Sequence, residues 1–227
     1  MLSNSEFLPS EKEFFDFLKI RFATVGIEFS EIEQYLLASL EISEKRFQSV
    51  KTKYFVNSAT GNARFSATHY SGHVLILYQL SRECFLQGRN DLAEKIYFLN
   101  ISTTATDLFY EIDLPIRTGC DHPLGSIIGR AVFDENSSLF FTQSCNIGNN
   151  IDASGTPIYP EVLGKLFMYP RSTIIGQCTL RGSVILANGT YVKDHGILED
   201  VVVFGSSPQL ILKPISDFQS YQELVFH

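Results

Sequence analysis

Two histidines one helical turn apart are the first residues of this 227-residue chain whose spacing could support chemistry. His69 and His73 are four positions apart, so they would share one face of an α-helix. Such a pair could bind a metal ion, but zinc sites use at least three protein ligands and no third candidate is apparent. We therefore predict no metal site.

Another histidine directly follows an acid. His122 lies between Asp121 and Pro123. Histidine is the usual general base for a hydroxyl proton, and a carboxylate behind it would fix its tautomer and stabilise the imidazolium. Neighbouring residues on a strand point to opposite faces, so Asp121 and His122 share a direction only if the backbone bends. The plain alternative is a surface histidine in a turn.

The cysteines and the bulk composition narrow the class of protein. Cys84, Cys120, Cys145 and Cys178 form no C-x-x-C pair, which is typical of free thiols in a reducing cytoplasm. A net charge of −7 argues against a nucleic-acid binder, whose affinity would come from a basic face. The sequence shows neither a signal-peptide pattern nor a run of ~18 apolar residues. We expect a cytoplasmic protein without a membrane partner.

The first half of the chain shows helical patterns. Capping-box pairs at Ser10–Glu13 and Ser30–Glu33 predict two helix starts, each followed by apolar residues at helical spacing. A long helix is expected from about His69 to near Gly88, and another from about Asn90 to Asn100.

The second half, from about Tyr110, shows a period of six. A large apolar residue recurs every six positions, and a small residue follows four positions after most of them. This alternation is typical of a triangular parallel β-helix, in which the large residue points inward and the small one fits a corner. An ordinary sheet with coincidental spacing is the alternative. The large residues are Val162, Met168, Ile174, Leu180, Leu186, Val192, Leu198, Phe204 and Leu210. The small residues are Ser172, Cys178, Val184, Thr190, Gly196 and Val202.

An upstream stretch repeats in a different phase. The polar, glycine-rich segment Gly148–Pro160 separates the two phases, and we expect it to be a loop between coils. The upstream series is Ile127, Phe133, Leu139 and Cys145. The expected fold class is α+β: an N-terminal all-α domain over 1–108, a left-handed parallel β-helix of hexapeptide repeats over 109–215, and a tail over 216–227.

Three segments resemble the serine acetyltransferase family. Leu77–Asn100 resembles the helical segment before that family's β-helix, and Cys120–Asn136 resembles its Asp-His-x-x-Gly segment with the coil that follows. Phe204–Lys213 resembles the Gly-x-Pro ending after the last coil of many hexapeptide acyltransferases. The likeness is greatest to serine-acetyltransferase-like proteins of surface-polysaccharide gene clusters, which share the YE-x-x-LP, HP-x-G and SP-x-L-x-x-K elements.

The resemblance implies roles for several residues. His122 matches the catalytic histidine, and Asp121 matches the neighbouring aspartate that contacts the acceptor amine. Asp113 resembles the aspartate that orients the histidine, although it lies nine positions before His122, closer than in the family. Glu111 or another carboxylate could serve instead. His69 falls where the polysaccharide-cluster relatives have a histidine that could approach the acceptor.

The interruption between coils departs from the family. Ile158-Tyr159-Pro160 stands where serine acetyltransferases have Arg-His-Pro. The arginine that could pair with a carboxylate is missing, which weakens the case for free serine as acceptor. We keep Tyr159 as a candidate substrate-binding residue.

The resemblance also implies acetyl-CoA as co-substrate, with no permanently bound cofactor. Gly148, Ser172 and Thr190 fall near the corners whose backbone meets the pantetheine arm. Lys193 and Lys213 could meet CoA phosphates or merely keep the solenoid soluble. An acyl carrier protein could present the same arm.

Three functions remain open at the level of sequence. The first is acetyl-CoA-dependent O-acetylation of serine or a serine-like acceptor. The second is acetylation of a sugar or nucleotide-sugar in surface-polysaccharide synthesis, and the third is a non-catalytic trimeric scaffold. One β-helix face alone offers a shallow groove, so we expect a homotrimer or a dimer of trimers with the active site between protomers.

Overall fold

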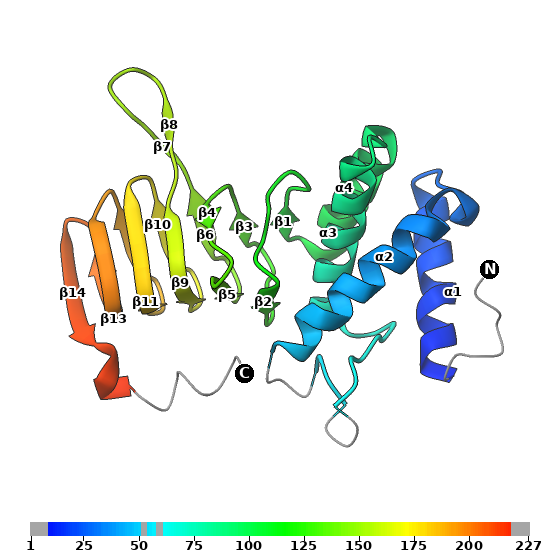
Figure 1. The fold of residues 1–227 in the computed structure, drawn as a ribbon, viewed down its shortest axis with the longest axis horizontal. Coiled ribbons are helices and arrows are strands. Elements are labelled where there is room, and N and C mark those ends of the chain that lie inside the picture. Colours follow the sequence, from blue (N-terminus) through cyan, green and yellow to red (C-terminus); the bar gives the residue numbers. More distant parts are fainter. Residues whose placement is uncertain (1–8, 51–53, 58–60, 219–227) are drawn as a thin grey trace.

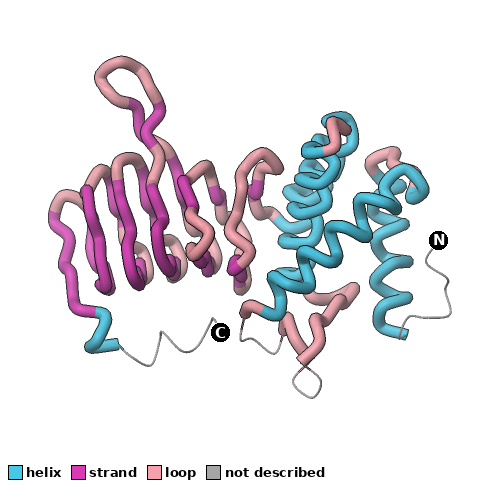
Figure 2. Tube along the Cα trace, in the orientation of Figure 1, coloured by secondary structure: helices cyan, strands magenta, loops and turns pink. Residues whose placement is uncertain are grey.

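The computed structural model describes residues 9–50, 54–57 and 61–218, with side chains from residue 12 onward. Helices gather at one end of the molecule and a solenoid of strands extends from them (Figures 1 and 2). The helices are α1 (Pro9–Thr24), α2 (Phe29–Gln48), α3 (Tyr70–Leu86) and α4 (Asn90–Thr104). The long helix expected near 69–88 and its successor from Asn90 are confirmed.

The start of α2 differs from the expected one. The helix begins at Phe29 with Glu28 as its N-cap, and the Glu28 N–H donates to Glu31 Oε2 at 2.9 Å. A capping pair two residues earlier therefore replaces the predicted Ser30–Glu33 pair, because a glutamate satisfies the free N–H and also suits the positive end of the helix dipole. The Ser10 side chain of the other predicted pair lies outside the described side chains.

The strands stack in parallel into three faces, which confirms the β-helix. The first face comprises β1 (Asp107–Leu108), β3 (Ile127–Ile128), β6 (Asn146–Gly148), β10 (Thr173–Ile175) and β12 (Tyr191–Lys193). The second comprises β4 (Val132–Phe133) and the first parts of β9 (Glu161–Met168), β11 (Cys178–Leu186) and β13 (Gly196–Ser206). The third comprises β2 (Arg117–Cys120), β5 (Ser138–Phe141) and the later parts of β9, β11 and β13.

Four short elements of the described chain depart from this parallel stack. The hairpin of β7 (Asn150–Ile151) and β8 (Pro157–Ile158) projects from the solenoid where the interrupting loop was expected (Figure 1). The last strand, β14 (Gln209–Pro214), pairs antiparallel with β13. The 3₁₀ helix Ile215–Phe218 packs beside the third face. Most of the predicted tail, 219–227, lies outside the described residues.

The large apolar residues that recur every six positions line the solenoid core for most of its length. The members of this six-residue series from Val162 to Leu198 are buried. The six-residue series no longer predicts the inward residue at Phe204, because an irregularity between Arg181 and Val184 pairs Leu186 with Val203. A one-residue shift turns a strand's side chains over, so Val203 is buried and Phe204 is not. Leu210 lies on antiparallel β14 and is only partly buried against the core.

In the upstream series, the first inward-pointing residue also lies one position later than predicted. Ile127 is 51% exposed, whereas Ile128 is buried and stacks on Ile147. Leu139 and Cys145 are buried as expected. The inward positions of the first face therefore follow its actual register rather than the six-residue count.

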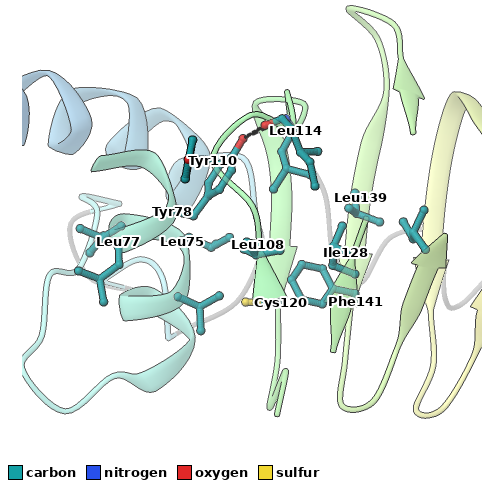
Figure 3. Close-up of a cluster of buried hydrophobic side chains, with 14 of the residues drawn as sticks. Leu75, Leu77, Tyr78, Leu108, Tyr110, Leu114, Cys120, Ile128, Leu139 and Phe141 are labelled. Atoms are coloured by element: carbon teal, nitrogen blue, oxygen red, sulfur yellow. Dashed lines mark hydrogen bonds between the residues drawn. The ribbon is translucent and has the colours of Figure 1, made fainter. Parts of the chain in front are cut away.

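The helical half and the solenoid share one continuous core, shown in Figure 3. The Tyr78 hydroxyl donates to the Ile112 carbonyl at 2.6 Å and accepts the Leu114 N–H at 3.1 Å. The buried guanidinium of Arg46 donates through Nη1 to the Pro115 carbonyl at 2.7 Å. The last helix ends at Thr104 and β1 begins at Asp107, so the solenoid starts just before the 108/109 boundary that the composition indicated.

Among the described residues, no helix is both long and apolar enough to cross a membrane.

Candidate active site

His122 lies at a bend between the third and first faces. Asp121, the preceding residue, still takes part in the backbone hydrogen bonding between β2 and β5, because its N–H donates to the Phe141 carbonyl at 3.1 Å. His122 itself adopts φ +47°, and its carbonyl accepts the Leu124 N–H at 2.9 Å. The left-handed region is uncommon for residues other than glycine, so surrounding contacts must hold this bend.

The bend brings His122 and Asp121 together. His122 Nε2 lies 3.7 Å from Asp121 Oδ1, and the two side chains are 78% and 44% exposed. The two adjacent side chains thus point in the same direction, which the sequence analysis expected only for a bent backbone. The imidazole is therefore accessible to a substrate and has a carboxylate at its side.

Hydrogen bonds from two directions hold the turn. The Thr106 hydroxyl donates to the Pro123 carbonyl at 3.0 Å, and the Gly125 N–H donates to the Ala105 carbonyl at 2.7 Å. The Ser144 N–H, in the next coil, donates to the Leu124 carbonyl at 2.9 Å. Both the end of α4 and the following coil thus fix the turn.

The start of α3 reaches the same end of β2. The Cys120 thiol donates to the Ser71 carbonyl at 3.6 Å, and the Tyr70 hydroxyl lies 3.2 Å from Thr106 Oγ1. Sequence reasoning missed Tyr70 and Thr106 as supports of the His122 turn. Their types carry no signal for this role, which depends on how the helices dock.

Asp113 lies elsewhere. Its carboxylate is 2.8 Å from Arg82 Nη2 and is 83% exposed. Ser71 marks the end of α3 beside Cys120, and Arg82 is eleven residues further along the helix, which is about 16 Å at 1.5 Å per residue. Within one chain, the structure does not bring Asp113 to His122. Glu111 pairs instead with Arg130, at 3.5 Å.

The two histidines of the helical half pack against aromatic rings, His73 buried and His69 partly buried. His69 precedes α3, and its ring contacts the rings of Tyr54 and Phe55 at centroid distances of 5.9 and 5.0 Å. Its buried Nδ1 has no hydrogen-bond partner within the part of the chain that the structure describes. Burial, followed by the charges of Arg64 and His73, lowers the pKa of His69 to about 4.

His73 is buried, with Nε2 3.1 Å from the Ala67 carbonyl, and burial lowers its pKa as well. The described residues contain no group of three His, Cys, Asp or Glu side chains that could hold a metal ion.

Tyr159 follows the projecting hairpin and lies under Arg130, whose guanidinium is 5.8 Å from the ring centroid. Both residues lie near the junction of the first and second faces, so they belong to a different corner from His122. Arg130 thus places a guanidinium beside Tyr159, next to the position where the sequence lacked an arginine. Sequence reasoning missed it because it belongs to an earlier coil.

The predicted donor-binding residues lie further along the solenoid. Ser172 and Thr190 are buried inside the corner between the third and first faces, one coil apart. Their N–H groups donate to the Tyr169 and Ala187 carbonyls. Their side chains therefore face the core, and their N–H groups are already bonded within the solenoid.

The remaining donor candidates are closer to the surface. Gly148 ends β6 and is partly exposed. Lys193 is exposed on β12. Lys213 is exposed on β14, with its Nζ 5.6 Å from the ring centroid of Phe204.

Among the comparisons with known proteins, only the comparison with solved structures finds matches. No protein-family model matches the chain, and no curated protein sequence matches it. The serine acetyltransferase from Brucella abortus strain S19 has a TM-score of 0.65 and 18% identity, covering 89% of this chain and 83% of that one.

Two ligand complexes have the same fold. The Neisseria gonorrhoeae serine acetyltransferase in complex with serine has a TM-score of 0.64 and 18% identity, covering 91% of this chain and 84% of that one. A serine acetyltransferase in complex with CoA has a TM-score of 0.58 and 12% identity, covering 81% and 73%. The chain therefore shares the fold of serine acetyltransferases, a helical domain followed by a left-handed β-helix.

Proposed function

We propose that this protein transfers an acetyl group from acetyl-CoA to the hydroxyl of a small acceptor, serine or a serine-like compound. The observation that carries the proposal is the exposed His122 beside Asp121 on a bent corner of the solenoid. The shared fold supports it, because structures of that fold were solved with CoA and with serine.

His122 is the general base of the proposed reaction. Its Nε2 faces Asp121, so Nδ1 takes the acceptor's hydroxyl proton while the oxygen attacks the thioester carbonyl. The C–O bond forms, the C–S bond breaks, and the imidazolium returns the proton to the departing CoA thiolate. Asp121 stabilises the imidazolium during the reaction, a role that its position suits better than that of Asp113. An acceptor amine would compete for the same carboxylate.

The donor would lie along the solenoid toward its last coils. Lys193 and Lys213 are exposed there and could meet the CoA phosphates. Gly148, Ser172 and Thr190 would serve through backbone carbonyls, which can accept a second hydrogen bond. The donor remains a co-substrate, and an acyl carrier protein could replace CoA.

The exposure of His122 favours an assembly that covers it. Leu124, two residues later, is 52% exposed. A neighbouring β-helix packed on this corner would bury Leu124 and enclose the site. We accordingly propose a homotrimer, with a dimer of trimers as the larger alternative. His69 and Tyr159 would contact the acceptor only if the packing of neighbouring protomers brought them to the His122 site.

A sugar or nucleotide-sugar acceptor is the second candidate. Tyr159 presents an aromatic ring beside Arg130, and an aromatic face suits the apolar face of a sugar ring. Arg130 itself is paired with Glu111, so a carboxylate of free serine would have to compete for it.

Thiol release from acetyl-CoA, measured across serine, homoserine and amino sugars, tests the function and its acceptor. We expect turnover with one of these classes and calorimetric binding of CoA. Binding without turnover on any acceptor would favour the scaffold. Absence of both would leave a carrier-protein donor to be tested with an acylated carrier, and failure there would overturn the proposal.

A further inference from the structure

A cavity lies among the helices, and its wall includes Tyr70, whose hydroxyl also contacts Thr106 behind the His122 turn. It has a volume of about 200 Å³, is open to solvent on one side, and is lined by α1, the turn before α3, α3 itself and the end of α4. Its floor is apolar, formed by Leu18, Leu77 and Leu99. The acyl-transfer proposal makes no use of this space.

One formal charge lies on the wall of the cavity among the described residues. It belongs to Arg21, which is exposed at the edge of the cavity with its guanidinium 5.0 Å from the Phe17 ring centroid. No ion pair involves Arg21 within the described residues. Two other titratable groups line the described wall, and burial lowers the pKa of His73 and raises the pKa of Tyr70, which favours the neutral form of each.

The hydroxyl groups on the wall are already engaged. Thr103 and Thr104 donate to carbonyls of their own helix, and the Tyr70 hydroxyl donates to the Thr104 carbonyl. Thr68 Oγ1 lies 3.2 Å from Ser66 Oγ. Among the described residues of the wall, Arg21 is therefore the one strong polar group that remains for a ligand.

An apolar floor with one guanidinium at its edge suits a compact apolar molecule with one carboxylate. Guanidinium and carboxylate form charge-assisted, paired hydrogen bonds. An engineered apolar cavity of about 150 Å³ in another protein binds benzene, so about 200 Å³ accommodates a six-carbon ring with a short acidic arm.

We propose that this cavity binds a small apolar monocarboxylic acid, with its carboxylate on Arg21 and its apolar body against Leu18, Leu77 and Leu99. The site is independent of the acyl-transfer proposal, so either can fail without the other.

Calorimetry on the full chain tests this site, with phenylacetate as the probe and 2-phenylethanol as its neutral counterpart. We expect one phenylacetate per chain, and binding about tenfold weaker or more for the alcohol, because the alcohol loses the charged pair. Arg21→Gln should weaken phenylacetate to a similar extent. Lys19→Gln is the matched control, because Lys19 lies on the same helix but over Phe29 and does not line the cavity. Thr103→Leu should block both compounds by filling the space.

No saturable binding of phenylacetate to the wild-type chain would overturn the proposal. Equal affinity of the acid and the alcohol, or of Arg21→Gln and Lys19→Gln, would also overturn it. Far-UV circular dichroism checks that each variant is folded. If Arg21→Gln is not, the comparison of acid and alcohol on the wild-type chain decides.

Discussion

His122 faces Asp121 because its own backbone turns into the left-handed region at φ +47°. The sequence predicted both residues, since the likeness to the Asp-His-x-x-Gly segment points to them directly. It could not decide which carboxylate accompanies the imidazole. That choice depends on the bend and on Arg82, which holds Asp113 at the far end of α3.

Asp121→Asn should lower kcat by about 10²-fold, because the imidazolium loses its stabilising carboxylate. Asp113→Asn is the matched control and should leave kcat near the wild-type value, since Asp113 is occupied by Arg82. Steady-state thiol release measures both. A large loss with Asp113→Asn and none with Asp121→Asn would show that another subunit's Asp113 orients His122.

His69 predicts a pH dependence of stability. Its pKa is about 4 in the folded chain, against about 6.5 when unfolded, so the unfolded state binds more protons between these values. The free energy of unfolding should therefore fall as pH drops from about 6.5 to about 4, by less than about 1.4 kcal/mol per pH unit because solvent screens the partly exposed ring. Urea unfolding at several pH values should show a shallower slope for His69→Gln than for the wild type. An unchanged slope would contradict this role, and His195→Gln serves as the control.

At the scale of elements, the six-residue period predicted the solenoid but not its irregularities. Large residues every six positions identified the inward track from Val162 to Leu198. The sequence did not predict that Val203, rather than Phe204, points inward. One residue fewer at a corner shifts the register but leaves the composition unchanged. The helix starts were predicted to within a few residues, since a glutamate cap can replace a serine cap.

Gly182 tests how tightly successive coils are stacked. It adopts φ +58°, and a Cβ there would overlap the Asp200 carboxylate, which accepts the Ser183 N–H at 2.9 Å. Gly189, at φ +72°, has open space around its Cα. Gly189→Ala should cost about 1 kcal/mol from backbone strain alone, and Gly182→Ala at least about 1 kcal/mol more from the displaced carboxylate. Equal urea midpoints for the two variants would contradict this stacking.

At the scale of the whole molecule, the helices and the solenoid form one continuous core rather than two joined bodies. The change in composition near Tyr110 predicted a boundary, yet Arg46 and Tyr78 of the helical half bind the backbone on the other side of it. Such contacts join distant parts of the sequence, and no local pattern predicts them.

Tyr78→Phe should lower the free energy of unfolding by about 1–3 kcal/mol, because the buried Leu114 N–H loses its partner. Tyr191→Phe, on the exposed side of β12, should change it little. Both variants should unfold in urea in one transition, seen alike in the helical circular dichroism signal and in tyrosine fluorescence. Two separated transitions in the wild-type chain would contradict the shared core.

The rate of thiol release from acetyl-CoA by His122→Gln tests the central claim most directly. The account predicts a loss of about 10²- to 10⁴-fold relative to the wild type on the same acceptor, with CoA binding unchanged. His195→Gln should keep the wild-type rate. Turnover by His122→Gln at the wild-type rate would contradict the assignment of His122 as the general base.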